Sequence, residues 1–253
     1  INIELSNFGN LTSATIPVGF TFTSNIDGVS YQFVATSEHT TSLSNGVLAF
    51  SSIPIYEGTY VRTNYIVNNQ NLEQKFTLND ENADTTTLLV DVFETSTSTS
   101  STTFTLATDL TKVTQSSNVY YLQESIDGKF EVYFGDGITG KALSDNNVVV
   151  LRYLVTNKTI ANGASSFTTS STISNVTDLE ILTVDVASGG AERESIQSIK
   201  LNAPLDYAAQ GRAVTTNDYK SIIPKVYPNT KSVQVYGGED NDCLLYTSDA
   251  ADE

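Results

Sequence analysis

The sequence predicts a β-rich α+β protein. Several small antiparallel β-domains, with sandwich or meander topology, precede a short helical pair and the start of a further αβ domain. Two observations predict this class. Short runs of β-branched and aromatic residues recur over residues 1–186, with Gly, Asn or Asp turns between them. After Gly189 and Gly190, apolar residues recur at helical spacing instead.

The clearest strands lie in the middle of the chain. Lys129–Phe134 alternates between apolar and polar residues, which indicates a half-buried strand. Asp127 and Gly128 separate it from the strand expected at Val119–Glu124, and they predict a type I′ turn in which both residues have φ > 0. Val148–Val155 is almost wholly apolar, which predicts a strand buried on both faces.

A glycine-rich segment, FGDGITGK, joins the last two of these strands. Its spacing matches the first seven positions of a phosphate-binding P-loop, but Ala142 stands where that loop needs a hydroxyl for Mg²⁺. The stretch before the next strand is also too short for the helix whose amides would face a phosphate. We therefore interpret the segment as a tight, exposed turn whose structural residues are Gly135, Asp136, Gly137 and Gly140.

Turn residues and changes in the pattern of apolar residues divide the chain into five parts. These are an N-terminal β-domain (1–74), a central β-domain with the FGDG hairpin (75–157), connecting strands (158–188), a helical segment with the start of the next domain (189–242), and a tail (243–253). The Ser/Thr run Thr95–Thr103 is interpreted as a mobile hairpin tip. Further strands are expected at Phe20–Thr23, Val29–Ala35, Val47–Phe50, Tyr60–Val67, Lys75–Leu78, Thr87–Phe93, Phe104–Ala107 and Glu180–Val184, with tight turns at Asp27-Gly28 and Asn45-Gly46.

Two helices are expected after residue 190. Glu192–Ala203 carries an apolar stripe (Ile196, Ile199 and Ala203), has Glu192 and Glu194 in its first turn, and ends at Pro204. Thr215 and Asp218 have the spacing of a capping box at the start of a second helix, which Pro224 should stop or kink early. The pattern of Ser232–Tyr236 predicts the first strand of a further domain.

Charge and composition limit the kinds of partner that the chain can bind. The formal net charge is −16, which argues against direct binding to nucleic acid. No apolar run approaches the length of a membrane span, and the chain begins with no signal segment. The chain contains no methionine, so we expect an internal fragment of a longer protein. The only cysteine, Cys243, lies in a tail that we interpret as an artefact of sequencing, Cys243–Glu253.

The sequence offers no convincing catalytic, cofactor or metal residues. His39, the only histidine, lies in a polar segment without a nucleophile motif, and a surface histidine is the simpler interpretation. Asp80, Asn82 and Asp84 mimic the start of a calcium loop, but Thr85 occupies the position where that loop needs glycine. Glu131 and Asp136, with Asp127 nearby, are the best pair of carboxylates for a glycosidase, yet the alternation places Glu131 on a solvated strand face.

Three motifs in order resemble the baseplate wedge subunit of contractile-tailed phages, of the T-even type, and more distantly the baseplate J-like family. They are FGDGITGK at 134–141, GGAERES with NAP at 189–204, and RAVTTNDY with KSV at 212–233. The similarity runs from Ala14 to Asp242. It implies a structural virion protein of the tail baseplate, made in the host cytoplasm. The expected partners are other baseplate wedge proteins and another copy of the chain, as a homodimer within the ring around the tail tube. It also implies movement on tail contraction, for which we expect a hinge near Gly189–Pro204.

Two other functions remain open from the sequence. One is a carbohydrate-binding or adhesin β-module, whose mark would be a platform of exposed aromatic residues; the chain has no tryptophan, and its tyrosines fall mostly in strand patterns. The other is a tail-associated glycosidase that uses the carboxylates named above. Neither needs a cofactor.

Overall fold

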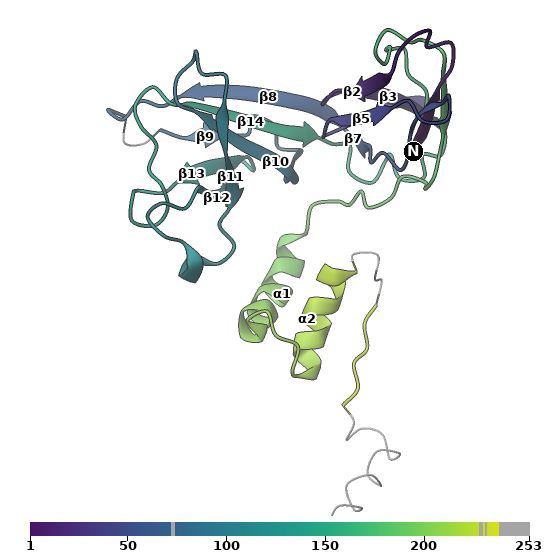
Figure 1. Ribbon diagram of the computed structural model, residues 1–253. Helices are drawn as coiled ribbons and strands as arrows, with labels where there is room; N and C mark the ends of the chain where they lie inside the picture. Colours follow the sequence, from purple (N-terminus) through teal and green to yellow (C-terminus); the bar gives the residue numbers. More distant parts are fainter. Residues whose placement is uncertain (72–73, 228–229, 231, 238–253) are drawn as a thin grey trace, which may run out of the picture. The chain divides into compact units, whose positions relative to one another are not determined.

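The computed structural model describes residues 1–71, 74–227, 230 and 232–237 (Figure 1). The chain divides into two compact units, Ile1–Gly190 and a second unit that begins at Ala191. The first unit is built from short strands and the second contains two helices, so the β-rich α+β class predicted from the sequence is confirmed. The tail expected at 243–253, like residues 238–242, lies outside the described residues.

The strands before β8, together with β15, form an N-terminal lobe of three small sheets. Their orders are β15-β1-β6, β2-β5 and β3-β4-β7, and every pair is antiparallel. Alternating burial along β1 and β3 places Ile3, Leu5 and Phe22 in a shared apolar core, as the period of two residues requires. The strands are β1 (Asn2–Leu5), β2 (Ser13–Ile16), β3 (Thr21–Ile26), β4 (Val29–Val34), β5 (His39–Ser42), β6 (Leu48–Phe50), β7 (Tyr56–Glu57) and β15 (Leu179–Leu182).

The rest of unit 1 is one seven-stranded sheet with the order β8-β14-β10-β11-β12-β13-β9. Figure 1 shows β8 and β14 as long strands that run from this sheet to the N-terminal lobe. All pairs are antiparallel except β11 and β12, which are parallel and which the antiparallel expectation did not foresee. The elements are β8 (Thr59–Ile66), β9 (Phe76–Thr77), β10 (Ala83–Phe93), β11 (Ser101–Leu106), the 3₁₀ helix η1 (Leu110–Lys112), β12 (Val119–Glu124), β13 (Phe130–Phe134) and β14 (Val148–Val155).

The strand β14 is buried on both faces, as its apolar sequence predicts. It lies between β8 and β10 in the sheet. Val149, Leu151 and Tyr153 join the core of the seven-stranded sheet, while Val150 and Leu154 on the opposite face are also almost fully buried. This core is closed by edge-to-face aromatic contacts among Tyr65, Phe76, Phe104 and Phe134.

Strand pairing assigns two segments differently from the sequence. Residues 59–66 were expected in the N-terminal β-domain, but β8 pairs with β14 along its whole length. Residues 158–188 were expected only as connecting strands, but β15 pairs with β1, and Ala161, Phe167 and Ile173 join the N-terminal core. The chain therefore leaves the N-terminal lobe at β8, builds the seven-stranded sheet, and returns after β14.

The tight turns follow two geometries. Asp27-Gly28 and Asn45-Gly46 have φ > 0 at both residues, as a type I′ turn requires. At Asp127-Gly128 only Gly128 has a positive φ, so the type I′ prediction is wrong there. The backbone N–H of Gly128 donates to the carbonyl of Ser125 at 3.0 Å, and Ser125 donates to Lys129 at 2.8 Å. This is a three-residue loop with the glycine after a type I turn.

Both helices extend past their prolines. The helix α1 runs from Ile196 to Ala209 with Pro204 inside it, and α2 runs from Thr216 to Val226 with Pro224 inside it. The prediction that Pro204 ends the first helix is wrong, because α1 continues to Ala209. Each proline still removes one intrahelical hydrogen bond. The turn beyond Pro204 is retained because α1 packs against α2, with Ala209 buried. Ser232–Tyr236, expected as a strand, is not one, since no strand in the described residues pairs with it.

The glycine pair at the end of unit 1 is anchored. The side-chain amide of Asn162 donates to the carbonyl of Gly190 at 2.8 Å, and its oxygen accepts from the Gly190 N–H at 2.9 Å. A Cβ on Gly190 would lie 2.1 Å from the carbonyl oxygen of Lys158. Gly190 is therefore needed for close backbone approach, whereas Gly189, with φ +94°, is needed for its left-handed backbone.

Candidate interaction surface

The helical pair is held by caps at both N-termini. Ser195 caps α1 by accepting a hydrogen bond from the Ser198 N–H. Thr215 caps α2 by accepting from the Asp218 N–H, while the Asp218 carboxylate accepts from the Thr215 N–H at 2.8 Å. The structure thus contains the capping box that the sequence predicts, with Asp in place of Glu. Glu194 precedes the cap of α1, so the acidic first turn expected there does not form.

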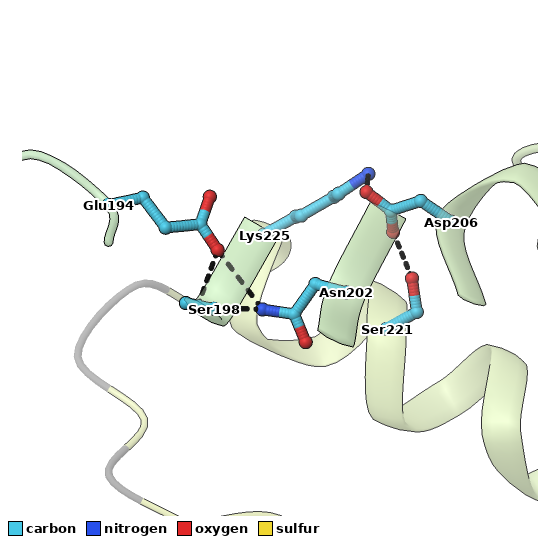
Figure 2. Close-up of polar contacts among 6 residues, drawn as sticks. All are labelled: Glu194, Ser198, Asn202, Asp206, Ser221 and Lys225. Carbon is cyan, nitrogen blue, oxygen red and sulfur yellow. Dashed lines mark hydrogen bonds and ion pairs between the residues drawn. The ribbon is translucent and has the colours of Figure 1, made fainter. Parts of the chain in front are cut away.

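Two polar clusters fix the side chains around the helices (Figure 2). The Glu194 carboxylate accepts from Ser198 Oγ at 2.6 Å and from Asn202 Nδ2 at 3.1 Å, and these bonds hold its pKa below the ordinary value. Glu194 thereby caps the first turns of α1 from outside the helix.

The second cluster joins α1 to α2. The Asp206 carboxylate on α1 pairs with Lys225 Nζ at 2.5 Å and accepts a hydrogen bond from Ser221 Oγ, both on α2. Lys225, and then Ser221, hold the pKa of Asp206 below its ordinary value. Ser221 is buried although it is polar, and this bond satisfies its hydroxyl. The contact fixes the rotation of α1 about its own axis against α2.

That rotation leaves an apolar stripe uncovered within the helical unit. Ile196, Ile199, Ala203 and Tyr207 follow one another at helical spacing on α1, and all four are exposed. The inner face of α1 is formed instead by Leu205, Asp206 and Ala209. The sequence correctly predicted that these residues share one face of the helix, but α2 does not cover that face. A helix with apolar residues on two sides is typical of one packed on two sides.

The same pair of helices also encloses a shallow open depression of about 440 Å³. Its walls are Leu205, Ala208 and Ala209 of α1, with Arg212, Val214 and residues of the α2 capping box. Part of its wall is the loop between the two helices, where Val214 is 77% exposed. Two of its polar residues, Thr215 and Asp218, are already engaged with each other in the capping box of α2.

The FGDG joint is a closed turn that satisfies its own polar groups. Asp136 Oδ1 accepts from the N–H groups of Ile138 and Thr139, both at 2.9 Å, and from Thr139 Oγ1 at 3.1 Å. These bonds lower the pKa of Asp136 to about 2. Gly137 N–H donates to the Gly140 carbonyl at 3.0 Å. Residues 142–147 contain no helix, so nothing here resembles a phosphate-binding loop.

Glu131 differs from its expected position. The alternation placed it on a solvated face, yet it is 6% exposed. Tyr133 Oη donates to one carboxylate oxygen at 2.5 Å, and Lys75 Nζ lies 3.1 Å from both oxygens. The bonds from Tyr133 and then Lys75 lower the pKa of Glu131. Side chains from β13 and from the segment before β9 cover this face, which a two-residue period cannot reveal.

These carboxylates lack the property that a glycosidase needs. Its general acid has a raised pKa, whereas the pKa values of Glu131 and Asp136 are both lowered by hydrogen bonds. Ser37 Oγ, just before β5, lies 3.0 Å from His39 Nε2 at the first residue of β5, a contact that the sequence did not predict. No carboxylate is hydrogen-bonded to the His39 ring in the described part of the chain, so no triad is assembled.

Two other structural findings concern ligands and membranes. In the described residues, no group of three or more His, Cys, Asp or Glu side chains is placed to hold a metal ion. Asp80 instead accepts a hydrogen bond from the Asn82 N–H in the turn before β10, and Asp84 accepts one from the Thr86 N–H inside β10. Neither of the two described helices is long and apolar enough to cross a membrane.

Comparison with known proteins identifies two regions of the chain. Residues 59–164 match the third domain of the bacteriophage baseplate wedge protein gp6, and residues 215–246 match the C-terminal domain I of the baseplate structural protein gp6. Together the two matches cover more than half of the chain. The first match begins at the first residue of β8, where strand pairing also begins the seven-stranded sheet.

The sequence of one curated relative supports the same assignment. The baseplate wedge protein gp6 of Enterobacteria phage T4 is 31% identical over 129 residues, which cover 42% of this chain and 20% of the relative. This chain therefore spans about a fifth of the length of the curated relative that it matches. The three motifs noted in the sequence fall in or between the matched regions. The chain belongs to the phage baseplate wedge protein gp6 family.

Proposed function

We propose that this chain is part of a structural subunit of the phage tail baseplate, and that it assembles there with other baseplate wedge proteins and with a second copy of itself. The family assignment supports the baseplate and virion location. The single structural observation that supports assembly is the exposed α1 stripe of Ile196, Ile199, Ala203 and Tyr207.

The stripe acts by burial. Exposing an apolar helix face to water is unfavourable, and covering it with another apolar surface lowers the free energy by roughly 25 cal/mol for each Å² buried. The polar clusters around Asp206 and Glu194 hold the helical pair rigid, so little conformational entropy is lost when a partner packs on it. The protein is in this view a structural part without enzymatic activity, because the carboxylates of Glu131 and Asp136 are engaged in structural bonds.

The location is tested on the virion. Tails of the phage that encodes this sequence are purified, the baseplate fraction is separated from sheath and tube, and peptides are measured by quantitative mass spectrometry. We expect peptides from both matched regions in the baseplate fraction, in fixed ratio to the other wedge proteins. Their absence from baseplates that are otherwise complete would refute the proposal.

The assembly surface is tested separately, with the full-length subunit in sedimentation velocity. Ile199→Asp should shift the subunit toward monomer, whereas Gln197→Asp, which makes the same charge change on another exposed part of α1, should not. Equal effects of the two variants would show that the stripe is not the contact.

A further inference from the structure

The seven-stranded sheet has an open edge at β8. In the order β8-β14-β10-β11-β12-β13-β9, β8 is the first strand and pairs on one side only, with β14. β8 is eight residues long, Thr59–Ile66, and long unpaired edges are uncommon in proteins because they pair with other chains. The chemistry of this edge therefore indicates what it binds.

The main-chain groups that face the open edge can be assigned from the register. In an antiparallel pair, hydrogen-bonded residues alternate with residues whose N–H and C=O point away. Val67 N–H donates to the Asn147 carbonyl at 2.8 Å, one step beyond the pair Ile66–Val148. Because this alternation continues along the strand, the N–H and C=O groups of the odd-numbered residues of β8 point toward β14. The even-numbered residues therefore face outward.

Two further hydrogen bonds agree with this assignment. Gly58 N–H donates away from β14 to the Gln32 carbonyl at 3.0 Å, and the Ile66 carbonyl accepts from Gln74 Nε2 at 2.7 Å. Both groups belong to even-numbered residues. These two bonds close the edge at its ends and leave an open window from Tyr60 to Asn64. Within the described residues, no hydrogen bond engages the outward groups of Arg62 or Asn64.

The window carries one cation. The exposed side chain of Arg62 lies opposite Arg152 in the register, but Arg152 is engaged by the Asp91 carboxylate. Arg62 has no ion pair in the part of the chain that the structure describes. On the other face of the window, Val61 and Thr63 are half-buried beside the sheet core. A strand added here would place one side chain beside Arg62 and its two neighbours against Val61 and Thr63.

We propose that β8 accepts an extended segment of a partner protein as an added strand along Tyr60–Asn64, and that this segment carries an acidic side chain opposite Arg62. The outward N–H and C=O groups of Arg62 and Asn64 supply the main-chain pairing. Arg62 supplies the preference for a carboxylate, since opposite charges directly across two strands attract and like charges repel. Small β-branched side chains on either side of the carboxylate fit the half-buried face. The inference does not depend on the proposed function.

The test uses the full chain and two short probes. The peptides Thr-Val-Glu-Val-Thr and Thr-Val-Lys-Val-Thr, with blocked ends, are titrated into labelled protein and followed by NMR of the backbone amides. We expect shifts confined to residues 60–64, slowed hydrogen exchange at Arg62 and Asn64, and about fivefold weaker binding of the lysine peptide. Arg62→Glu should reverse the preference. Lys129→Glu, the same charge change in the β12–β13 loop, should leave it unchanged.

A second variant separates the main-chain contact from the charge. Asn64→Pro removes an outward N–H and leaves the bonds to β14 intact, so it should weaken both peptides equally. Three results would overturn the proposal: amides of Arg62 and Asn64 already protected in the free chain, equal binding of the two peptides to the unmodified protein, or no binding of either. A concentration-dependent dimer that occupies the same amides would also overturn it, since the edge would then belong to a second copy.

Discussion

The substitution Gly135→Ala should destabilise unit 1 strongly, through a clash that its sequence position does not reveal. A Cβ at residue 135 would lie 2.3 Å from the Gly140 carbonyl carbon, 2.4 Å from its oxygen and 2.6 Å from its Cα. Ordinary contacts between carbon atoms are roughly 3.5–4.0 Å, so the two backbone segments must separate by about 1 Å. Backbone cannot rotate out of the way as the end of a side chain can.

The separation would break the bonds that close the FGDG turn. Gly137 N–H donates to the Gly140 carbonyl at 3.0 Å, and the neighbouring Lys141 N–H donates to Ser117 at 2.9 Å. Each bond contributes about 1 kcal/mol net, and the strain of the remaining contact adds to this. We expect Gly135→Ala to lower the free energy of unfolding by about 3 kcal/mol.

A matched control lies two residues away. Gly137 has φ +87°, but a Cβ there would meet nothing closer than Ala142 Cβ at 3.8 Å. Gly137→Ala should therefore cost only the strain of a left-handed backbone. The net cost is about 1 kcal/mol, because alanine also lowers the conformational entropy of the unfolded chain and so offsets part of the strain. Urea unfolding of the full chain, followed by far-UV circular dichroism, measures both variants. If Gly135→Ala costs no more than Gly137→Ala, the clash argument is refuted.

Three other predictions test the remaining polar contacts. Asp91→Ala removes the partner of the partly buried Arg152 and should cost about 2–3 kcal/mol in urea unfolding, and replacing Arg152 as well should recover part of the loss in a double-mutant cycle. The pKa of Asp136 is lowered from 3.8 to about 2, so the stability that its carboxylate adds is present above pH 3.8 and is lost as the pH falls toward 2. With Asp136→Asn, the free energy of unfolding should depend less on pH over that range. An unchanged pH dependence would contradict the assignment. Thr215→Ala removes the cap of α2 and should cost about 1 kcal/mol, seen as faster amide exchange in its first turn, whereas the exposed Lys220→Ala should change nothing there.

The sequence predicts local features of this fold well. The bounds of β12 and β14 agree with the structure because their patterns depend on residues adjacent in the chain. The caps of α2 and the turns at Asp27 and Asn45 are equally local. The sequence did not show that β8 pairs with β14, because β14 follows more than eighty residues later in the chain.

The candidate surfaces depended even more on distant contacts. The period of α1 revealed its apolar stripe, but only the pairing of Asp206 with Lys225 shows which face of α1 turns toward α2. The burial of Glu131 required Lys75, from a segment far earlier in the chain. The open edge of β8 is a property of the sheet order, and no pattern within residues 59–66 distinguishes an edge strand from a central one.

The anchoring of Gly190 bears on the hinge expected at Gly189–Pro204. Asn162 grips both main-chain groups of Gly190, and Pro204 lies well inside α1, so neither end of that stretch is a free swivel. Between Gly190 and the N-cap Ser195, residues 191–194 form no helix or strand. A tension applied along the chain from α1 would therefore reach unit 1 first at the Asn162–Gly190 bonds, in the Lys158–Gly163 corner, rather than at β15.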